Sequence, residues 1–172
     1  MLVLGIDPGY AITGYGLVEY QRGRLRVIDY GVVSTSARTA FPERLLTISD
    51  MLAELIEHYK PEVVAVEELF FSRNTTTAIG TAQARGVAVL AGAKAGLPVY
   101  EYTPMQVKLA VTGYGRADKQ QVQQMVRILL NLRQIPKPDD AADALAIAIC
   151  HAHTGPRKNA KAVGGYQSCT PI

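Results

Sequence analysis

Acidic residues stand at three places in this sequence where burial should make them costly. Asp7 ends the apolar stretch LVLGID near the N-terminus, and Glu67 ends a second apolar stretch, VVAVE. Asp143 stands inside DDAADALAIAI, a segment rich in Ala, Leu and Ile. A ligand shared by these carboxylates would offset the cost of burying them.

The acids of the last segment allow two pairings on a helix. Asp140 and Asp143 are three residues apart, which separates them by about 60° around the axis, while Asp139 and Asp143 are four apart. Spacing alone does not decide between the pairings. Because Asp139 follows Pro138, it is the natural N-cap, which favours Asp140 as the partner.

Converging carboxylates without lysine neighbours would repel one another and raise one another's pKa. Divalent cations remove this repulsion, and hard oxygen ligands suit Mg²⁺ or Mn²⁺. No His/Cys cluster has the spacing of a zinc site, and Cys150 and Cys169 are expected to be free thiols. Two divalent ions can activate water and stabilise a leaving oxygen in phosphodiester hydrolysis. The acids therefore favour a metal-dependent reaction of this type.

Apolar periodicity predicts the elements that position the acids. Strands are expected over 2–7, 12–20, 24–33, 63–67 and 98–102. Helices are expected over about 42–59, 75–95, 104–111, 118–132 and 139–153. This order predicts a mixed five-stranded sheet, three antiparallel strands and then two parallel ones, flanked by helices. If the strands that end at Asp7 and Glu67 are neighbours, both carboxylates lie at the sheet edge where ligands bind.

Charge is unevenly distributed along the chain. Residues 1–71 carry six Lys/Arg and ten Asp/Glu, whereas residues 72–134 carry eight Lys/Arg and two Asp/Glu. A basic middle segment suits a polyanionic partner. No apolar run reaches the roughly 18 residues that span a bilayer, and the N-terminus lacks signal-peptide features, so we expect a soluble, cytoplasmic protein without a membrane partner. We expect one domain over 1–154 and a flexible basic tail over 155–172.

Five separated motifs resemble those of the RuvC family of bacterial Holliday-junction resolvases. They are GIDPGYAITGYG, VAVEELFFSRN, AQARGV, GRADKQQVQQMV and DDAADALAIAI, and they span about residues 1–153. The resemblance implies an α/β, RNase H-like fold. It also implies a homodimer that nicks two opposed strands of a four-way DNA junction in recombination and repair, leaving 5′-phosphate and 3′-hydroxyl ends. The implied cofactor is Mg²⁺, with Mn²⁺ as a substitute and two ions per subunit, and the implied partner is the RuvA–RuvB branch-migration complex.

The resemblance also assigns residues. The family's catalytic and metal-binding acids fall on Asp7, Glu67, Asp140 and Asp143, which resolves the choice between Asp139 and Asp140. Its DNA-binding positions fall on Phe70, an aromatic at the junction centre, and on Lys108 and Lys119, the lysines on the side of the active site.

Further basic residues are expected to contact the DNA backbone, and two histidines are not assigned to catalysis. The expected backbone contacts are Arg73, Arg85 and Arg116. His151 and His153 stand at the end of the last helix, where positive charge suits the helix dipole.

Two other classes of protein are alternative interpretations of the same sequence. Asp-x-Gly after a first strand, followed by a hairpin, also opens actin-like ATPases and sugar kinases. Those proteins need a second such domain to hold the nucleotide, and 172 residues leave no room for it. A junction-binding protein without catalysis has no need of four intact carboxylates.

Overall fold

The computed structural model describes residues 1–69, 75–155 and 161–162. The strands are β1 (Leu2–Asp7), β2 (Ile12–Gln21), β3 (Arg24–Ser34), β4 (Val63–Glu67), β5 (Val99–Tyr102) and β6 (Lys161–Ala162). The helices are α1 (Phe41–Tyr59), α2 (Thr75–Lys94), α3 (Pro104–Thr112), α4 (Lys119–Leu129) and α5 (Asp139–Thr154). None of these described helices is long and apolar enough to cross a membrane.

The strands form one mixed sheet in the order β3-β2-β1-β4-β5-β6. β1, β2 and β3 are antiparallel, whereas β4 runs parallel to β1 and β5 runs parallel to β4. The five expected strands and their directions are confirmed. β6 adds two residues antiparallel to β5, within the expected tail. The domain boundary at residue 154 stays a prediction, because residues 156–160 and 163–172 lie outside the described part of the chain.

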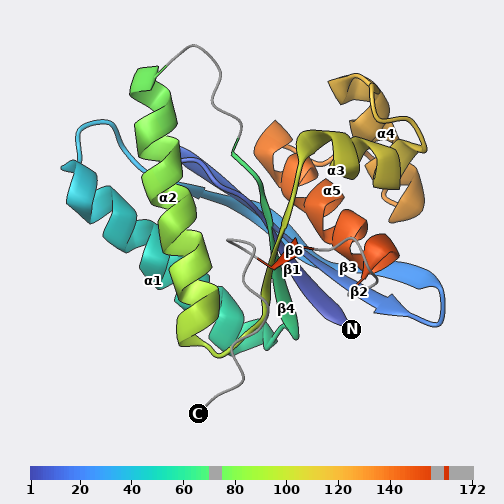
Figure 1. The fold of residues 1–172 in the computed structure, drawn as a ribbon, viewed down its shortest axis with the longest axis horizontal. Coiled ribbons are helices and arrows are strands. Elements are labelled where there is room, and N and C mark those ends of the chain that lie inside the picture. The colour runs from blue at the N-terminus through green and yellow to red at the C-terminus, as the bar shows by residue number, and fades with distance from the viewer. Residues whose placement is uncertain (70–74, 156–160, 163–172) are drawn as a thin grey trace.

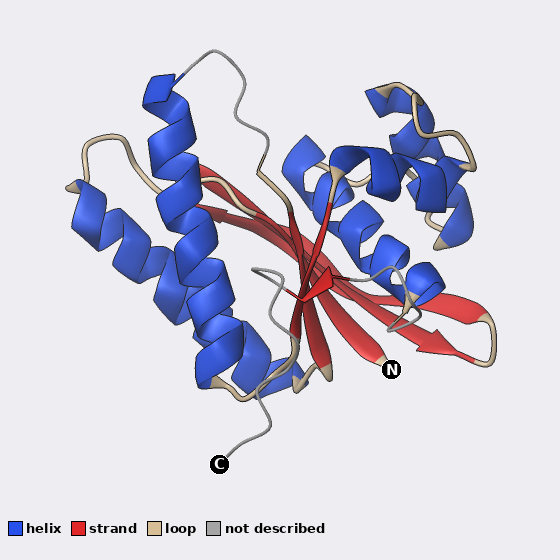
Figure 2. Ribbon diagram, viewed as in Figure 1, coloured by secondary structure: helices blue, strands red, loops and turns tan. Residues whose placement is uncertain are grey.

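Helices cover both faces of the sheet (Figures 1 and 2). α1 and α2 lie on one face, and α5 lies on the other with α3 and α4 outside it. Successive residues of a strand point to opposite faces. Leu4 and Ile6 of β1 accordingly pack in the core under α1 and α2, whereas Val3 packs in the core under α5. Asp7 has the parity of Val3, so its carboxylate faces α5.

The same alternation applies to β4. Val64 and Val66 belong to the core under α1 and α2, and Val63 and Ala65 belong to the core under α5. Glu67 shares the parity of Val63 and Ala65. Both strand-ending carboxylates therefore face the helix that carries the other two acids.

Glycines in β1 and β2 allow α5 to approach the sheet closely. A Cβ atom at Gly14 would lie 2.1 Å from the backbone oxygen of Asp140, and one at Gly5 would lie 2.2 Å from that of Ala144. Gly14 is the residue paired with Asp7 across β1 and β2. The absence of a side chain at Gly14 thus sets how near the start of α5 comes to Asp7.

We expect Gly14→Ala to displace the start of α5 and to separate the acids. The substitution should lower the free energy of unfolding by at least about 2 kcal/mol, because the added methyl meets backbone rather than a movable side chain. Gly31→Ala is the matched control, since the three atoms nearest to its Cβ would all belong to the side chain of Tyr15, which can shift. Denaturant unfolding of both variants checks the expectation, and equal losses would contradict it.

Candidate active site

Four carboxylates from three elements converge at one edge of the sheet. Ile6 of β1 is paired with Val66 of β4, so the next residues along the two parallel strands, Asp7 and Glu67, lie side by side. The first two turns of α5 bring Asp140 and Asp143 over this edge. The structure therefore brings together the four acids that the sequence had singled out.

Burial and mutual repulsion change the acidity of these groups. Burial, followed by the charges of Glu67, Asp143 and Asp140, raises the pKa of Asp7 from 3.8 to about 7. Burial and the charge of Asp143 raise the pKa of Glu67 from 4.5 to about 7. The pKa of Asp143 is also raised, mainly by burial. These carboxyl groups are thus desolvated and within electrostatic reach of one another.

A small cavity of about 250 Å³ opens between the sheet edge and the helices. It contains two of the acids, Glu67 and Asp143, and two lysines, Lys108 and Lys119. Pro104, Val107, Val122 and Ala146 complete its walls. Acids and lysines around one cavity are suited to a phosphate group and the cations that accompany it.

Lys119 contacts the acids directly. Its Nζ lies 3.0 Å from Oδ2 of Asp143 and 3.6 Å from Oδ2 of Asp139. The acids therefore do not converge without a lysine neighbour, and Lys119 lies on the active-site side that the resemblance implied. Lys119 is remote from them in sequence and reaches them only because α4 packs beside α5. Its charge lowers the pKa of Asp143, but burial has the larger effect.

A capping box fixes the start of α4 and hence the position of Lys119. The Asp118 carboxylate accepts from the backbone N–H of Gln121, and the Gln121 side chain accepts from the N–H of Asp118.

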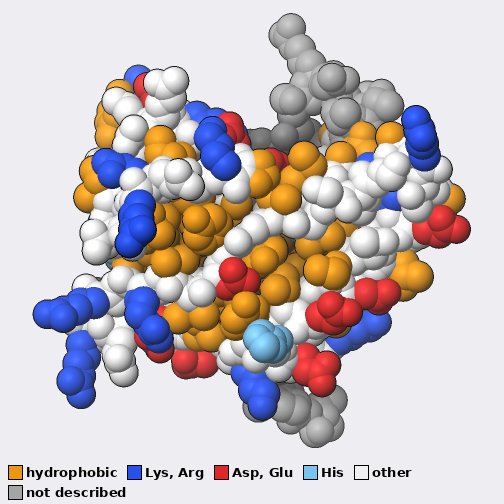
Figure 3. Space-filling view, turned by 180° about the vertical axis from the view of Figure 1, so that it is seen from behind, with side chains coloured by type: hydrophobic (Ala, Val, Ile, Leu, Met, Phe, Trp, Pro, Cys, Tyr) orange, Lys and Arg blue, Asp and Glu red, His pale blue; other side chains and the backbone are white. Residues whose placement is uncertain are grey.

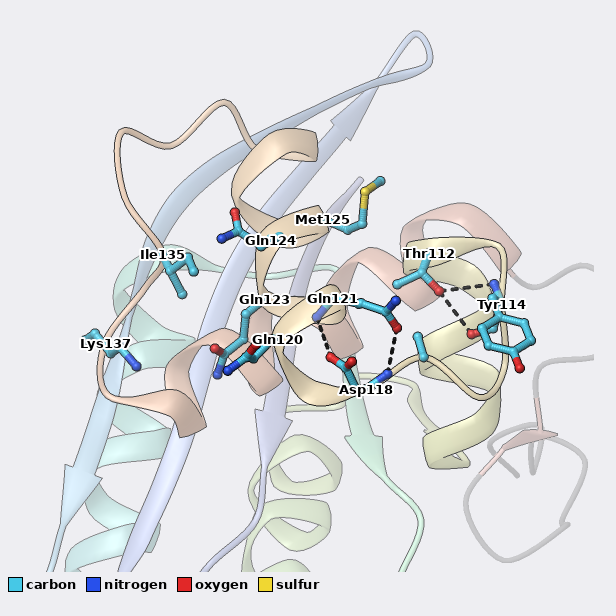
Figure 4. Close-up of a pocket in the computed structure, with 11 residues that line it drawn as sticks. Thr112, Tyr114, Asp118, Gln120, Gln121, Gln123, Gln124, Met125, Ile135 and Lys137 are labelled. Atoms are coloured by element: carbon cyan, nitrogen blue, oxygen red, sulfur yellow. Dashed lines mark hydrogen bonds between the residues drawn. The ribbon is translucent and has the colours of Figure 1, made fainter.

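Figure 4 shows this cap beside a groove of about 840 Å³, whose walls include Gln120, Gln123 and Lys137. The groove contains no acid of the candidate site, so we place the chemistry in the smaller cavity.

The two neighbouring acids at the start of α5 have different surroundings. The helix begins at Asp139 with Pro138 as its N-cap, so the expectation that Asp139 is the N-cap is wrong. The carboxylate of Asp139 accepts from Nζ of Lys137 at 2.7 Å, and this bond lowers its pKa. Asp140 instead acts on Asp7 through its charge. This geometry agrees with Asp140 as the member of the cluster.

Arg85 supports the end of β4, a role that sequence reasoning missed. Its Nε donates to the backbone oxygen of Glu67 at 3.1 Å, and its Nη2 forms an ion pair with the carboxylate of Glu101. This guanidinium is largely buried and is occupied by protein groups, rather than facing DNA as expected. The sequence did offer one indication of this ion pair. Glu101 is one of only two acids within the basic segment 72–134, so a basic residue of that segment could be expected to pair with it.

Of the other expected DNA contacts, only Arg116 lies in the described part of the chain, and it does not line the cavity of the acids. Arg116 lines a separate hollow of about 380 Å³ with Met105, Leu109 and Tyr114. Phe70 and Arg73 lie outside the described residues, and their roles stay predictions.

A basic patch that the sequence did not indicate lies on the β2–β3 hairpin. Arg22, Arg24 and Arg26 line a hollow of about 730 Å³ there, at the end of the sheet opposite the acids. Figure 3 shows Lys and Arg side chains gathered toward this end, on the left of the view.

The histidine expectation needs one correction. His151 is fully buried, and its Nδ1 lies 2.7 Å from the hydroxyl of Tyr102. Burial lowers its pKa to about 4, so it is neutral near pH 7 and does not act on the helix dipole as a cation. Cys150 is a buried free thiol, as expected, and Cys169 lies outside the described residues.

Comparisons with known proteins find relatives over most of this chain. The family model for the crossover junction endodeoxyribonuclease RuvC matches residues 3–151. The chain is 66% identical to the RuvC endonuclease of Desulfitobacterium hafniense over 154 residues, 90% of this chain and 93% of that protein. It is 62% identical to the one of Alkaliphilus metalliredigens over 155 residues, 90% of this chain and 94% of that protein.

A solved structure is similar over nearly the whole fold. The structure of Thermus thermophilus RuvC in complex with a Holliday junction substrate has a TM-score of 0.89 and 41% sequence identity, and the match covers 95% of this chain and 99% of that one. The expected RNase H-like fold is confirmed. The matches also decide against the ATPase and sugar-kinase alternative. The chain belongs to the RuvC family of crossover junction endodeoxyribonucleases.

Proposed function

We propose that this protein resolves Holliday junctions by metal-assisted hydrolysis, with Asp7, Glu67, Asp140 and Asp143 as the ligands of divalent cations. Mg²⁺ is the proposed physiological ion, with Mn²⁺ as a substitute and two ions per subunit. When bound, such ions supply an activated water and stabilise the leaving oxygen. The products are a 5′-phosphate and a 3′-hydroxyl on each of two opposed strands.

One observation supports the metal assignment most strongly. Asp7 and Glu67 both have a pKa near 7 without a cation, because each is buried among other carboxyls. An all-oxygen donor set of this kind suits a hard cation. Among the described residues no group of three or more His, Cys, Asp or Glu side chains already has the spacing of a metal cage. Such spacing is not expected of carboxylates that repel one another.

The two lysines of the cavity have a complementary role. Lys108 and Lys119 share the cavity with Glu67 and Asp143, and the side chain of Lys119 is half exposed. We assign both lysines to the phosphates next to the cleaved bond, where their charge orients the backbone without reading bases. The ion pair with Asp143 holds Lys119 at the cavity until DNA enters.

The proposed substrate is four-way junction DNA, the substrate with which Thermus thermophilus RuvC forms its complex. We assign Arg73 and Arg116 to backbone phosphates and Phe70 to the unstacked bases at the crossover, since it follows Glu67 by three residues. The RuvA–RuvB branch-migration complex is the proposed protein partner, and the cytoplasm the proposed location.

Two active sites are required for two cuts, which favours a homodimer with two-fold symmetry. α2 carries an exposed stripe that recurs at helical spacing, namely Ile79, Gln83, Gly86 and Leu90. Ile79 is 62% exposed and Leu90 is 52% exposed, and a Cβ at Gly86 would meet nothing. A glycine between two exposed aliphatic residues allows close approach of a second helix. We propose this stripe as the dimer contact.

Asp7→Asn should abolish junction cleavage while junction binding stays intact or becomes tighter. The amide removes one ligand charge from the proposed metal site and also removes a negative charge close to the DNA. Cleavage assays on a synthetic four-way junction with saturating Mg²⁺, paired with binding in Ca²⁺, measure the two effects. Near-normal nicking by the variant would refute the metal assignment.

The metal-free protein should lose stability as the pH rises from about 4 to about 7. Over this range the unfolded chain releases the protons of Asp7 and Glu67, whereas the folded protein still holds them, so the free energy of unfolding falls. Asp7→Asn removes the part of this loss in stability that comes from ionising the buried Asp7 carboxyl. In EDTA the variant should be more stable than the wild type at pH 8, by up to a few kcal/mol, and the difference should vanish near pH 4.

Denaturant unfolding at both pH values checks this pH dependence, and Mg²⁺ at pH 8 should stabilise the wild type more than Asp7→Asn. A stability difference that does not change with pH would contradict the burial of an unmatched charge at Asp7.

Replacing both Ile79 and Leu90 by Glu should convert the protein into a monomer, because the added charges would be buried against each other at the proposed contact. The wild type should sediment at about twice the chain mass of 18.6 kDa, and the double variant at the chain mass. Leu109→Glu, an equally exposed leucine on α3, is the control and should leave the dimer unchanged. A double variant that still sediments as a dimer excludes this face of α2.

A further inference from the structure

Arg44 is a buried cation that has no acidic partner among the residues that the structure describes. Its side chain is on α1 and only 8% exposed. It takes part in none of the ion pairs formed among the described residues. A buried charge is costly unless protein groups replace its hydration. The groups that surround Arg44 therefore indicate what its burial achieves.

Among the described residues, the guanidinium of Arg44 bonds to Tyr10, in the turn after Asp7, and to Thr35, directly after β3. Its Nη2 donates to the backbone oxygen of Tyr10 at 3.2 Å, and its Nε donates to the hydroxyl of Thr35 at 2.8 Å. The guanidinium carbon also lies 4.7 Å above the centre of the Tyr10 ring, within cation–π distance. The Thr35 hydroxyl in turn donates to the same Tyr10 oxygen at 2.6 Å.

Tyr10 belongs to the turn that follows Asp7. The turn is tight, since a Cβ at Gly9 would lie 2.3 Å from the oxygen of Ile12, and the Thr13 hydroxyl donates to the Gly9 oxygen at 2.6 Å. Within such a turn, a shift of Tyr10 is transmitted to Asp7 through only two residues, Pro8 and Gly9.

The ring of Tyr10 also contacts α2. A Cβ at Gly80 would lie 2.8 Å from this ring, so α2 packs closely against Tyr10 at a residue without a side chain. α2 begins eight residues after Glu67, at Thr75. Tyr10 thus joins the turn after Asp7 to α2, the helix that follows Glu67 in the chain. Arg44 lies above its ring and donates to its backbone oxygen.

We propose that Arg44 is a positioning residue for the nuclease reaction, which fixes the Asp7 turn against α1 and α2 through Tyr10. The proposal rests on the assignment of Asp7 to a metal ion in the proposed function. Arg44 does not contact substrate or cation in this role. It determines how well the Asp7 carboxylate is held in place before a cation binds.

Arg44→Met tests the proposal, because methionine keeps the apolar stem and removes the charge and its donors. Hydrogen exchange in the metal-free variant should be faster in peptides that cover residues 8–13 and unchanged in peptides of β4. The Mg²⁺ concentration for half-maximal junction cleavage should rise by about tenfold, the usual effect of losing a group that orients a metal ligand. Junction affinity without metal should hardly change.

Arg44→Lys should lie between Arg44→Met and the wild type. It restores the charge above the Tyr10 ring, but an ammonium cannot donate in two fixed directions as a guanidinium does. If Arg44→Met does not fold, Thr35→Val supplies the same test, since it removes the hydroxyl that joins Arg44 to the turn.

Two controls separate positioning from charge and from stability. Arg38→Met removes an equally charged, exposed residue from the segment before α1, and Ile48→Val weakens the core under α1. Neither should change the Mg²⁺ midpoint.

A normal Mg²⁺ midpoint in Arg44→Met, whatever its exchange or melting temperature, would overturn the proposal. Weaker junction binding with an unchanged midpoint would do so as well, and would make Arg44 a DNA contact. Failure of the metal assignment itself would appear as near-normal cleavage by Asp7→Asn, whereas failure of the Arg44 proposal alone would leave Asp7→Asn inactive and the Mg²⁺ midpoint of Arg44→Met normal.

Discussion

Electrostatic repulsion among four partly buried carboxyl groups is the constraint on which the rest of the structure depends. Asp7 and Glu67 each have a pKa near 7, which means that the folded chain without cations resists full ionisation of its own site. Such an arrangement is unfavourable for stability alone. A divalent cation and a phosphate that bind there would offset the repulsion between the carboxylates. The repulsion also explains why several local features are needed to hold the acids together.

Those features are distributed over every layer of the fold. The parallel pairing of β1 and β4 places two acids side by side, and their parity turns both toward α5. Gly14 allows the start of α5 to approach Asp7, and Arg85 holds the carbonyl of Glu67. Lys119 offsets part of the negative charge before substrate is present. Backbone geometry and a few long-range polar contacts thus position groups that would otherwise move apart.

Much of this was predictable from the sequence, and the remainder was not for identifiable reasons. Strand alternation and helical spacing are local patterns, so the five strands, the helices and the acids at the strand ends could be derived from them. The ion pair of Lys119, the support from Arg85 and the burial of His151 depend on partners far away in the sequence. Periodicity does not reveal such partners. The glycines opposite α5 were visible in GIDPGYAITGYG, but their function follows only from the packing.

The measurement that tests the central claim most directly is the location of bound cations. Crystals soaked in Mn²⁺ at pH 8, with anomalous scattering recorded at the manganese edge, would locate the ions without relying on activity. The account predicts manganese between Asp7, Glu67, Asp140 and Asp143, with Lys119 displaced from Asp143. Manganese bound elsewhere, or an empty site at saturating Mn²⁺ with the ion pair between Lys119 and Asp143 retained, would contradict it.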